Sequence, residues 1–140
     1  MSALLCLALN IYFEARSEEK YGVMAMAAPA MVVLNRVKDP RYPNDVCEVV
    51  KQAKKNRNGF PRRHLCQFSW YCDGKSDQPT DKDAWEWSNV IAELVLSGQI
   101  KDVTDGATHS HANYVEPDWQ IVKTFTGRIG SHLFYRWERS

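Results

Sequence analysis

The chain has 140 residues, of which 44% are hydrophobic and 25% are charged. This length suffices for one domain, residues 1–140, whose core needs neither a metal nor a disulfide framework. The formal net charge of +1 excludes strong overall attraction to nucleic acid, and no stretch approaches the roughly 20 apolar residues that cross a bilayer. We therefore expect a monomeric domain that binds no nucleic acid and does not insert into a membrane.

The four cysteines are Cys6, Cys47, Cys66 and Cys72. They match neither the paired spacing of a zinc site nor the density of a disulfide-rich secreted domain, so we expect reduced thiols. Residues 1–9 resemble the apolar part of a signal peptide, but they lack a basic start and run directly into polar residues. We interpret them as part of a helix of the mature protein.

Apolar residues at helical spacing predict a first helix from about Ser2 to Glu14, with Leu4, Ala8, Ile11 and Ala15 on its buried face. Glu14 stands at the end of this apolar run. Apolar surroundings raise the pKa of a carboxyl group, and an acid of this kind can protonate a leaving-group oxygen near neutral pH. The alternative is that Glu14 only solvates the end of the helix.

A second helix is predicted after Ser17, which can cap it, with Ala27, Ala30 and Leu34 in its buried stripe. Pro29 interrupts the stripe and removes a backbone donor, so we expect a kink or a split near Ala25. Farther along, Asn44 or Asp45 caps a short helix of valines.

No acidic residue occurs between Glu48 and Asp73, an interval rich in lysine and arginine. We interpret it as a solvated loop, with binding to an anionic polymer as the alternative. Thr80 is expected to open the next helix, which buries Trp87 and Ile91 and ends at Gly98.

The last forty residues change from helical to extended patterns. Residues 109–115 are expected to be extended, and residues 122–125 and 129–135 to form a hairpin across 126–128. The predicted fold class is therefore α+β, mainly helical, with a small C-terminal antiparallel hairpin or sheet.

Four motifs occur in order: Tyr-Phe-Glu-Ala-Arg at 12–16, Val-Leu-Asn-Arg-Val at 33–37, Cys-Gln-Phe-Ser-Trp at 66–70, and Ile-Gly-Ser-His-Leu-Phe-Tyr-Arg at 129–136. Together with residues 106–109 and 117–119, they resemble the spore-cortex-lytic type of bacterial cell wall hydrolase. The resemblance implies a lysozyme-like fold, cleavage of peptidoglycan glycan strands and Glu14 as the catalytic acid.

The resemblance also places Gln67 and Ser69 along the sugar groove, and the further candidates for substrate contact are Trp70, His109, Tyr114 and Trp119. Amide and hydroxyl groups can each donate to and accept from sugar hydroxyls, and aromatic rings can stack on sugar faces. The alternatives are that the polar pair caps a turn and that the aromatic residues belong to the core. Asn35 and Arg36 are expected to secure the end of their helix rather than to touch substrate.

Three rival functions remain open. A zinc-dependent amidase or peptidase could use His109, His111 and His132, although no supporting ligand motif accompanies them. A thiol hydrolase could use Cys66 or Cys72 with a histidine. A non-catalytic binding module would leave Glu14 dispensable. We expect no metal and no cofactor.

The bond cleaved is expected to join N-acetylmuramic acid to N-acetylglucosamine. The candidates for a second carboxylate, Asp73, Glu116 and Asp118, lie in predicted turns or loops, so the C6 hydroxyl of the muramyl sugar is the preferred attacking group. This favours a lytic transglycosylase, with a lysozyme-like hydrolase as the alternative. The apparent lack of a signal sequence suggests a phage endolysin that accumulates in the cytoplasm before it reaches the wall.

Overall fold

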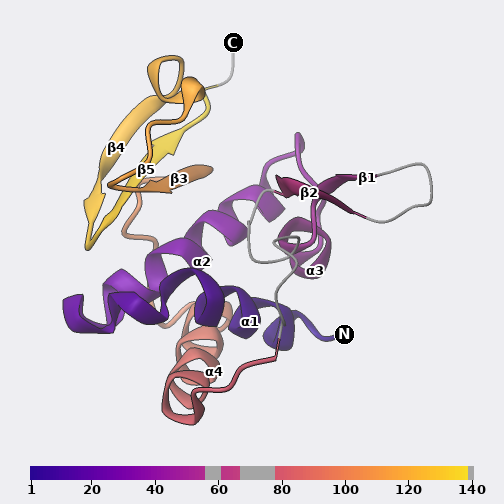
Figure 1. The fold of residues 1–140 in the computed structure, drawn as a ribbon, viewed down its shortest axis with the longest axis vertical. Coiled ribbons are helices and arrows are strands. Elements are labelled where there is room, and N and C mark those ends of the chain that lie inside the picture. Colours follow the sequence, from indigo (N-terminus) through magenta and orange to yellow (C-terminus); the bar gives the residue numbers. More distant parts are fainter. Residues whose placement is uncertain (56–60, 67–77, 139–140) are drawn as a thin grey trace.

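The computed structural model describes residues 1–55, 61–66 and 78–138, and the side chains of 1–52 and 78–138. Figure 1 shows the helices gathered together, with a three-stranded sheet to one side. The elements in chain order are α1 (Ala3–Ala15), the 3-10 helix η1 (Arg16–Tyr21), α2 (Val23–Lys38), α3 (Val46–Val50), β1 (Ala53–Lys55), β2 (Pro61–Cys66), α4 (Lys82–Leu96), β3 (His109–Ala112), the 3-10 helix η3 (Asp118–Ile121), β4 (Thr124–Ile129) and β5 (His132–Arg136).

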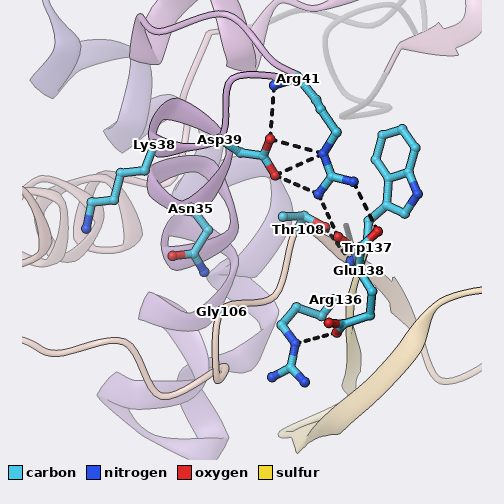
Figure 2. Close-up of a pocket in the computed structure, with 9 residues that line it drawn as sticks. All are labelled: Asn35, Lys38, Asp39, Arg41, Gly106, Thr108, Arg136, Trp137 and Glu138. Carbon is cyan, nitrogen blue, oxygen red and sulfur yellow. Dashed lines mark hydrogen bonds and ion pairs between the residues drawn. The ribbon is translucent and has the colours of Figure 1, made fainter. Parts of the chain in front are cut away.

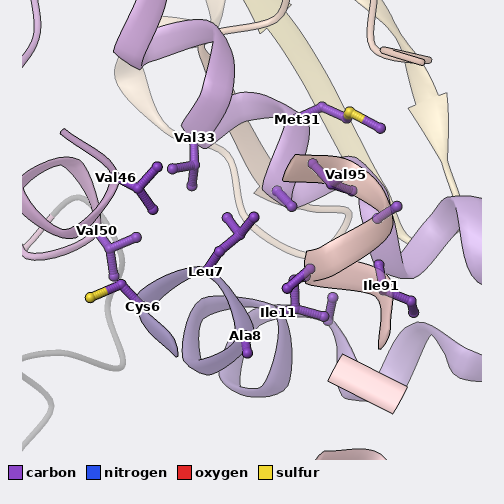
Figure 3. Close-up of a cluster of buried hydrophobic side chains, with 14 of the residues drawn as sticks. Cys6, Leu7, Ala8, Ile11, Met31, Val33, Val46, Val50, Ile91 and Val95 are labelled. Atoms are coloured by element: carbon purple, nitrogen blue, oxygen red, sulfur yellow. The ribbon is translucent and has the colours of Figure 1, made fainter. Parts of the chain in front are cut away.

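Helix α1 lies at the centre of the helical part and packs against α2, α3 and α4. It begins close to the predicted residue, Ser2, whose side chain accepts a hydrogen bond from the Leu5 backbone N–H at 3.1 Å. Ala8, Ile11 and Ala15 of the predicted face are buried, whereas Leu4 is exposed. The buried face also includes Leu7 (Figure 3) and is wider than predicted, because three neighbouring helices cover α1.

A disulfide joins Cys6 of α1 to Cys47 of α3, with 5.2 Å between their Cα atoms. The prediction of reduced thiols is therefore wrong for this pair. The two residues are 41 positions apart, and only the packing of α1 on α3 brings them together, so their spacing in the sequence gave no sign of the bond. The side chains of Cys66 and Cys72 lie outside the described residues.

Helix α2 runs without a break through Pro29, whose side chain is buried. The expected split near Ala25 is wrong; the interruption lies earlier, at Gly22, whose φ of 98° separates η1 from α2. Ser17 therefore belongs to η1 and does not cap α2. Pro29 removes one backbone hydrogen bond, and the apolar contacts of the buried face offset that loss.

The other helices begin close to the predicted positions. Asp45 caps α3 by accepting from the Glu48 N–H at 3.0 Å, and Asp81, rather than Thr80, caps α4. Ile91 is buried in α4 as expected, but Trp87 is 47% exposed. Within the described part of the chain, no helix is long and apolar enough to cross a membrane.

Part of the basic interval forms two strands, β1 and β2, which pair antiparallel. The prediction of a loop is therefore wrong for residues 53–55 and 61–66. The prediction was based on charge, and a high content of lysine and arginine does not prevent the backbone pairing of short strands.

The C-terminal sheet has the order β3-β5-β4, and every pairing is antiparallel. Its hairpin turns at Gly130 and Ser131, between the paired residues Ile129 and His132, and not at the predicted 126–128. Gly127 lies instead at an irregularity within β4. The α+β prediction, mainly helical with a small C-terminal antiparallel sheet, is confirmed.

The two faces of this sheet differ. Paired residues of antiparallel strands share a face, so His109 and His111 of β3 lie on the same face as Tyr135 of β5. Phe134 lies on the opposite face and is fully buried in a cluster with Ala28 and other apolar side chains. The sheet therefore covers α2 with one face and carries aromatic rings on the other.

Candidate active site

A pocket of about 390 Å³ lies where the C-terminal end of α1 meets the sheet. Its walls come from α1, η1, the segment that includes β3, and the start of β5. The residues that line it are Phe13, Glu14, Ser17, Ser110, His111, Ala112, Tyr114, Val115, Ser131 and His132. We refer to it as the Glu14 pocket.

Glu14 lines this pocket with a carboxyl group that no described residue pairs with or hydrogen-bonds. Burial raises its pKa from the ordinary value of 4.5 to about 7, because loss of solvent contact disfavours the charged form and no donor or cation among the described residues compensates. A substantial fraction of Glu14 is therefore protonated at neutral pH. Such a group can donate a proton to a substrate and accept it back.

Arg16 does not orient Glu14. Its guanidinium donates to the hydroxyl of Tyr12 and lies 4.5 Å from the centre of the Tyr12 ring. The same hydroxyl accepts from the backbone N–H groups of Thr80, at 3.1 Å, and Asp81, at 2.9 Å. Tyr12 thus fastens the start of α4 to the turn of α1 that carries Glu14.

A second carboxylate, Glu18, lies behind the wall of the pocket and is 1% exposed. The backbone N–H of Ser131 donates to its Oε1 at 2.7 Å, and the Ser131 hydroxyl donates to its Oε2 at 2.7 Å. Nδ1 of His132 lies 3.2 Å from Oε1. Glu18 therefore holds the hairpin turn that carries two pocket residues.

This role of Glu18 was not predicted from the sequence. One signal was available: the Ser-His pair at 131–132 interrupts an apolar hairpin and needs a polar partner. Gly130 belongs to the same contact, since a Cβ atom there would lie 2.6 Å from Oε1 of Glu18.

Tyr114 and His111 stand beside Glu14 in the pocket wall. Tyr114 is 86% exposed, so it is not a core residue, and its ring is free to contact a ligand. His111 Nδ1 lies 2.8 Å from the carbonyl of Ala112, and Nε2 lies 3.0 Å from the hydroxyl of Tyr135. Both ring nitrogens of His111 are thus engaged within the sheet.

His109 and Trp119 do not line the Glu14 pocket. They form an aromatic cluster on the outer face of the sheet, in which the Trp119 ring lies 5.0 Å from His109, 5.7 Å from His111 and 5.2 Å from Tyr135. Burial, reinforced by Arg36 and other nearby cations, lowers the pKa of His109 to about 3. Because His111 contacts Trp119 and also lines the pocket, the cluster adjoins the pocket without belonging to it.

Gln67, Ser69 and Trp70 lie outside the described residues. Their assignment to the sugar groove stays a prediction.

The geometry disfavours the rival zinc site. His109 and His111 share the outer face of the sheet, whereas His132 pairs with Ala112 and lies on the other face. Across the residues whose placement is described, no three histidine, cysteine or acidic side chains gather as a metal would require. The three histidines therefore do not form a common ligand set.

Glu14 is the single carboxylate among the described residues that line the pocket. Two of the three candidates for a second acid, Glu116 and Asp118, are exposed and do not line it. The third, Asp73, lies outside the described residues.

A family profile for cell wall hydrolases matches residues 18–135, most of the chain. The chain belongs to the cell wall hydrolase family. The match begins just after Glu14 and contains Glu18, the basic interval and the whole sheet.

Two solved structures show the same fold as this cell wall hydrolase. The catalytic domain of the germination-specific lytic transglycosylase SleB from Bacillus anthracis has a TM-score of 0.66 and 20% identity, covering 96% of this chain and 93% of that one. The catalytic domain of SleB from Bacillus cereus has a TM-score of 0.65 and 21% identity, covering 96% and 89%. Comparison with curated protein sequences finds no significant match. The likeness supports the lysozyme-like fold.

The cell wall hydrolase has a second pocket, of about 430 Å³, at the other end of β5 (Figure 2). Both of its arginines are paired with carboxylates: Arg41 contacts Asp39 at 2.7 Å, and Arg136 contacts Glu138 at 2.6 Å. Asn35 also lines it and donates to the carbonyl of Ala107 at 2.9 Å. We refer to it as the Arg41 pocket.

Asn35 and Arg36 of the Val-Leu-Asn-Arg-Val motif make hydrogen bonds beside this second pocket. Besides its bond to Ala107, Asn35 donates to Asp102 at 3.0 Å, and Arg36 donates to the carbonyl of Thr108 at 2.7 Å. These bonds tie the end of α2 to the segment that leads into β3. The prediction that Asn35 and Arg36 secure the helix end is confirmed, but they do so away from Glu14.

Proposed function

We propose that this cell wall hydrolase is a lytic transglycosylase that cleaves the bond between N-acetylmuramic acid and N-acetylglucosamine in peptidoglycan. Membership of the family and a fold shared with the SleB catalytic domain support this assignment. The observation that carries it is the Glu14 carboxyl group, which lines a pocket, has no partner in the part of the chain that the structure describes, and has a pKa of about 7.

In the proposed reaction, protonated Glu14 donates its proton to the glycosidic oxygen as the bond from that oxygen to C1 of the muramyl sugar breaks. The C6 hydroxyl of the same sugar then bonds to C1 and gives its proton to the Glu14 carboxylate. The acid is thereby regenerated, and the product is a 1,6-anhydro sugar. The rings of Tyr114, Trp119 and His109 are proposed to contact neighbouring sugars, together with Gln67, Ser69 and Trp70.

The single carboxylate favours this route over hydrolysis. A hydrolase needs a positioned water and usually a second carboxylate to activate it or to stabilise the charged sugar. Among the described residues, the pocket offers Glu14 alone. The C6 hydroxyl needs no such partner, because the sugar itself holds it near the reacting carbon.

Mass spectrometry of digested sacculi tests the proposal. Muropeptides should end in 1,6-anhydro-N-acetylmuramic acid and should be lighter by one water than products of hydrolysis. Reducing N-acetylmuramic acid ends would instead identify a lysozyme-like hydrolase. New peptide or amino ends with intact glycan would exclude both reactions and favour an amidase or peptidase.

A further inference from the structure

Two imidazole rings line the Glu14 pocket, and they differ in what their nitrogens contact. The carbonyl of Ala112 and the hydroxyl of Tyr135 engage both nitrogens of His111. His132 has only one engaged nitrogen: Nδ1 lies 3.2 Å from Glu18, and no described residue hydrogen-bonds Nε2.

Glu18 determines which nitrogen of His132 carries the proton. Nδ1 is buried, and the Glu18 carboxylate beside it is an ion-pair contact rather than an aligned hydrogen bond. A carboxylate accepts hydrogen bonds and does not donate them, so the neutral ring keeps its proton on Nδ1. Nε2 is then left with a free lone pair on the ring that lines the pocket.

We propose that His132 is a substrate contact of the Glu14 pocket, whose Nε2 accepts a hydrogen bond from a hydroxyl or amide N–H of the glycan. This inference rests on the proposed function, since it requires a glycan in the pocket. Glu18 is the positioning residue: its contact with Nδ1 and its two bonds from Ser131 fix the ring in the pocket wall.

The groups that face His132 are Glu18 from η1, Glu14 from α1 and His111 from β3. Burial lowers the pKa of His132 below its ordinary value of 6.5, and Glu18 opposes that shift only in part. The ring is therefore neutral at neutral pH. Acidification protonates Nε2 and converts the acceptor into a donor, so the contact should be lost as pH falls.

Binding of sacculi to the Glu14→Gln protein provides the test, because this background is inactive and Glu14 no longer titrates. The second change is His132→Asn, whose amide N–H can reach Glu18 from the place of Nδ1 while nothing replaces Nε2. We expect affinity at pH 7 to fall about tenfold, which is the scale of one hydrogen bond to a buried group. The pH dependence below 6.5 should flatten, and the melting temperature should stay close to that of the Glu14→Gln protein.

Arg128→Ala is the matched control, since Arg128 donates to the Gly130 carbonyl in the same hairpin but does not line the pocket. Its affinity and acid dependence should equal those of the Glu14→Gln background. If the folded protein that carries both Glu14→Gln and His132→Asn binds sacculi as tightly as the Glu14→Gln protein, and its affinity falls in the same way as pH is lowered, the inference is overturned. The proposed function would remain intact. A parent enzyme that releases no muropeptides would overturn both.

Discussion

The two pockets lie at opposite ends of β5 and differ in how their charges are compensated. In the Arg41 pocket, Asp39 and Glu138 neutralise the arginines. In the Glu14 pocket, the carboxyl that faces the cavity has no partner among the described residues, and burial raises its pKa to about 7. The pockets are similar in volume, about 430 and 390 Å³, so size does not identify the site.

The contrast shows that an unpaired buried group is the stronger sign of chemistry. Ion-paired groups stabilise a surface, but they stay charged near neutral pH and therefore do not exchange protons with a substrate. The same contrast separates Glu14 from Glu18, which lie in neighbouring turns of the chain. Glu18 has three donor groups near it and holds the pocket wall, whereas Glu14 lines the cavity and has no donor among the residues that are described.

The largest effect on stability is expected at Gly130, which precedes two residues of the Glu14 pocket wall. Gly130 has a φ of 59°, and a Cβ atom there would lie 2.6 Å from Oε1 of Glu18. Gly130→Ala should therefore lower the free energy of unfolding by about 3 kcal/mol, from the left-handed backbone and the displaced carboxylate together. Chemical denaturation measures this.

Gly106 of the Arg41 pocket is the matched control. Its φ of 77° is also left-handed, but an added Cβ would meet only the Arg136 side chain, at 3.4 Å. Gly106→Ala should cost about 1 kcal/mol, the backbone contribution alone. Equal losses for the two variants would show that Gly130 is not required by its approach to Glu18.

Glu14→Gln should make the protein more stable at alkaline pH. The folded pKa of about 7 exceeds the ordinary value of 4.5, so the folded protein binds this proton more tightly than the unfolded chain does. Parental stability should fall between pH 4.5 and 7, and the variant should lack this loss. We expect a gain of about 2 kcal/mol at pH 8 and none at pH 4. If the difference in stability between the two proteins does not depend on pH, the pKa of Glu14 is not raised by folding.

Removing a charge from the Arg41 pocket should lower the stability of the protein, by less than Glu14→Gln raises it at alkaline pH. Arg41→Met breaks the contact with Asp39 and the bond to the Trp137 carbonyl at 2.6 Å, at a half-buried site. The melting temperature should drop slightly, because an ion pair that keeps contact with solvent contributes little to stability. The rate of muropeptide release should stay within about twofold of the parent, since one surface contact is involved. A large loss of rate would mean that this pocket also takes part in the reaction.

Local chemistry explains what the sequence predicted correctly. Asp45 is a cap that acts within its own turn, and Glu14 stood out because one carboxylate followed an apolar helical run. The cell wall hydrolase resemblance was readable because its motifs occur in order. These features do not depend on how distant segments meet.

The missed features arise from contacts between distant segments. The disulfide joins residues 41 positions apart, and Glu18 meets Ser131 across 113 positions. Neither the disulfide nor the contact of Glu18 with Ser131 can be predicted from the spacing of residues along the chain. The hairpin turn was misplaced because Gly127 and Gly130 are both plausible turn residues, and only docking on Glu18 selects Gly130.

The central claim is that Glu14 supplies the proton for glycan cleavage, and the most direct test measures muropeptide release from purified sacculi by the parent and by Glu14→Gln. Gln preserves the size of the side chain and removes the transferable proton. We predict that the variant stays folded and loses at least about 100-fold in rate, the lower range of general acid catalysis. A folded Glu14→Gln protein that releases muropeptides at the parental rate would contradict the claim.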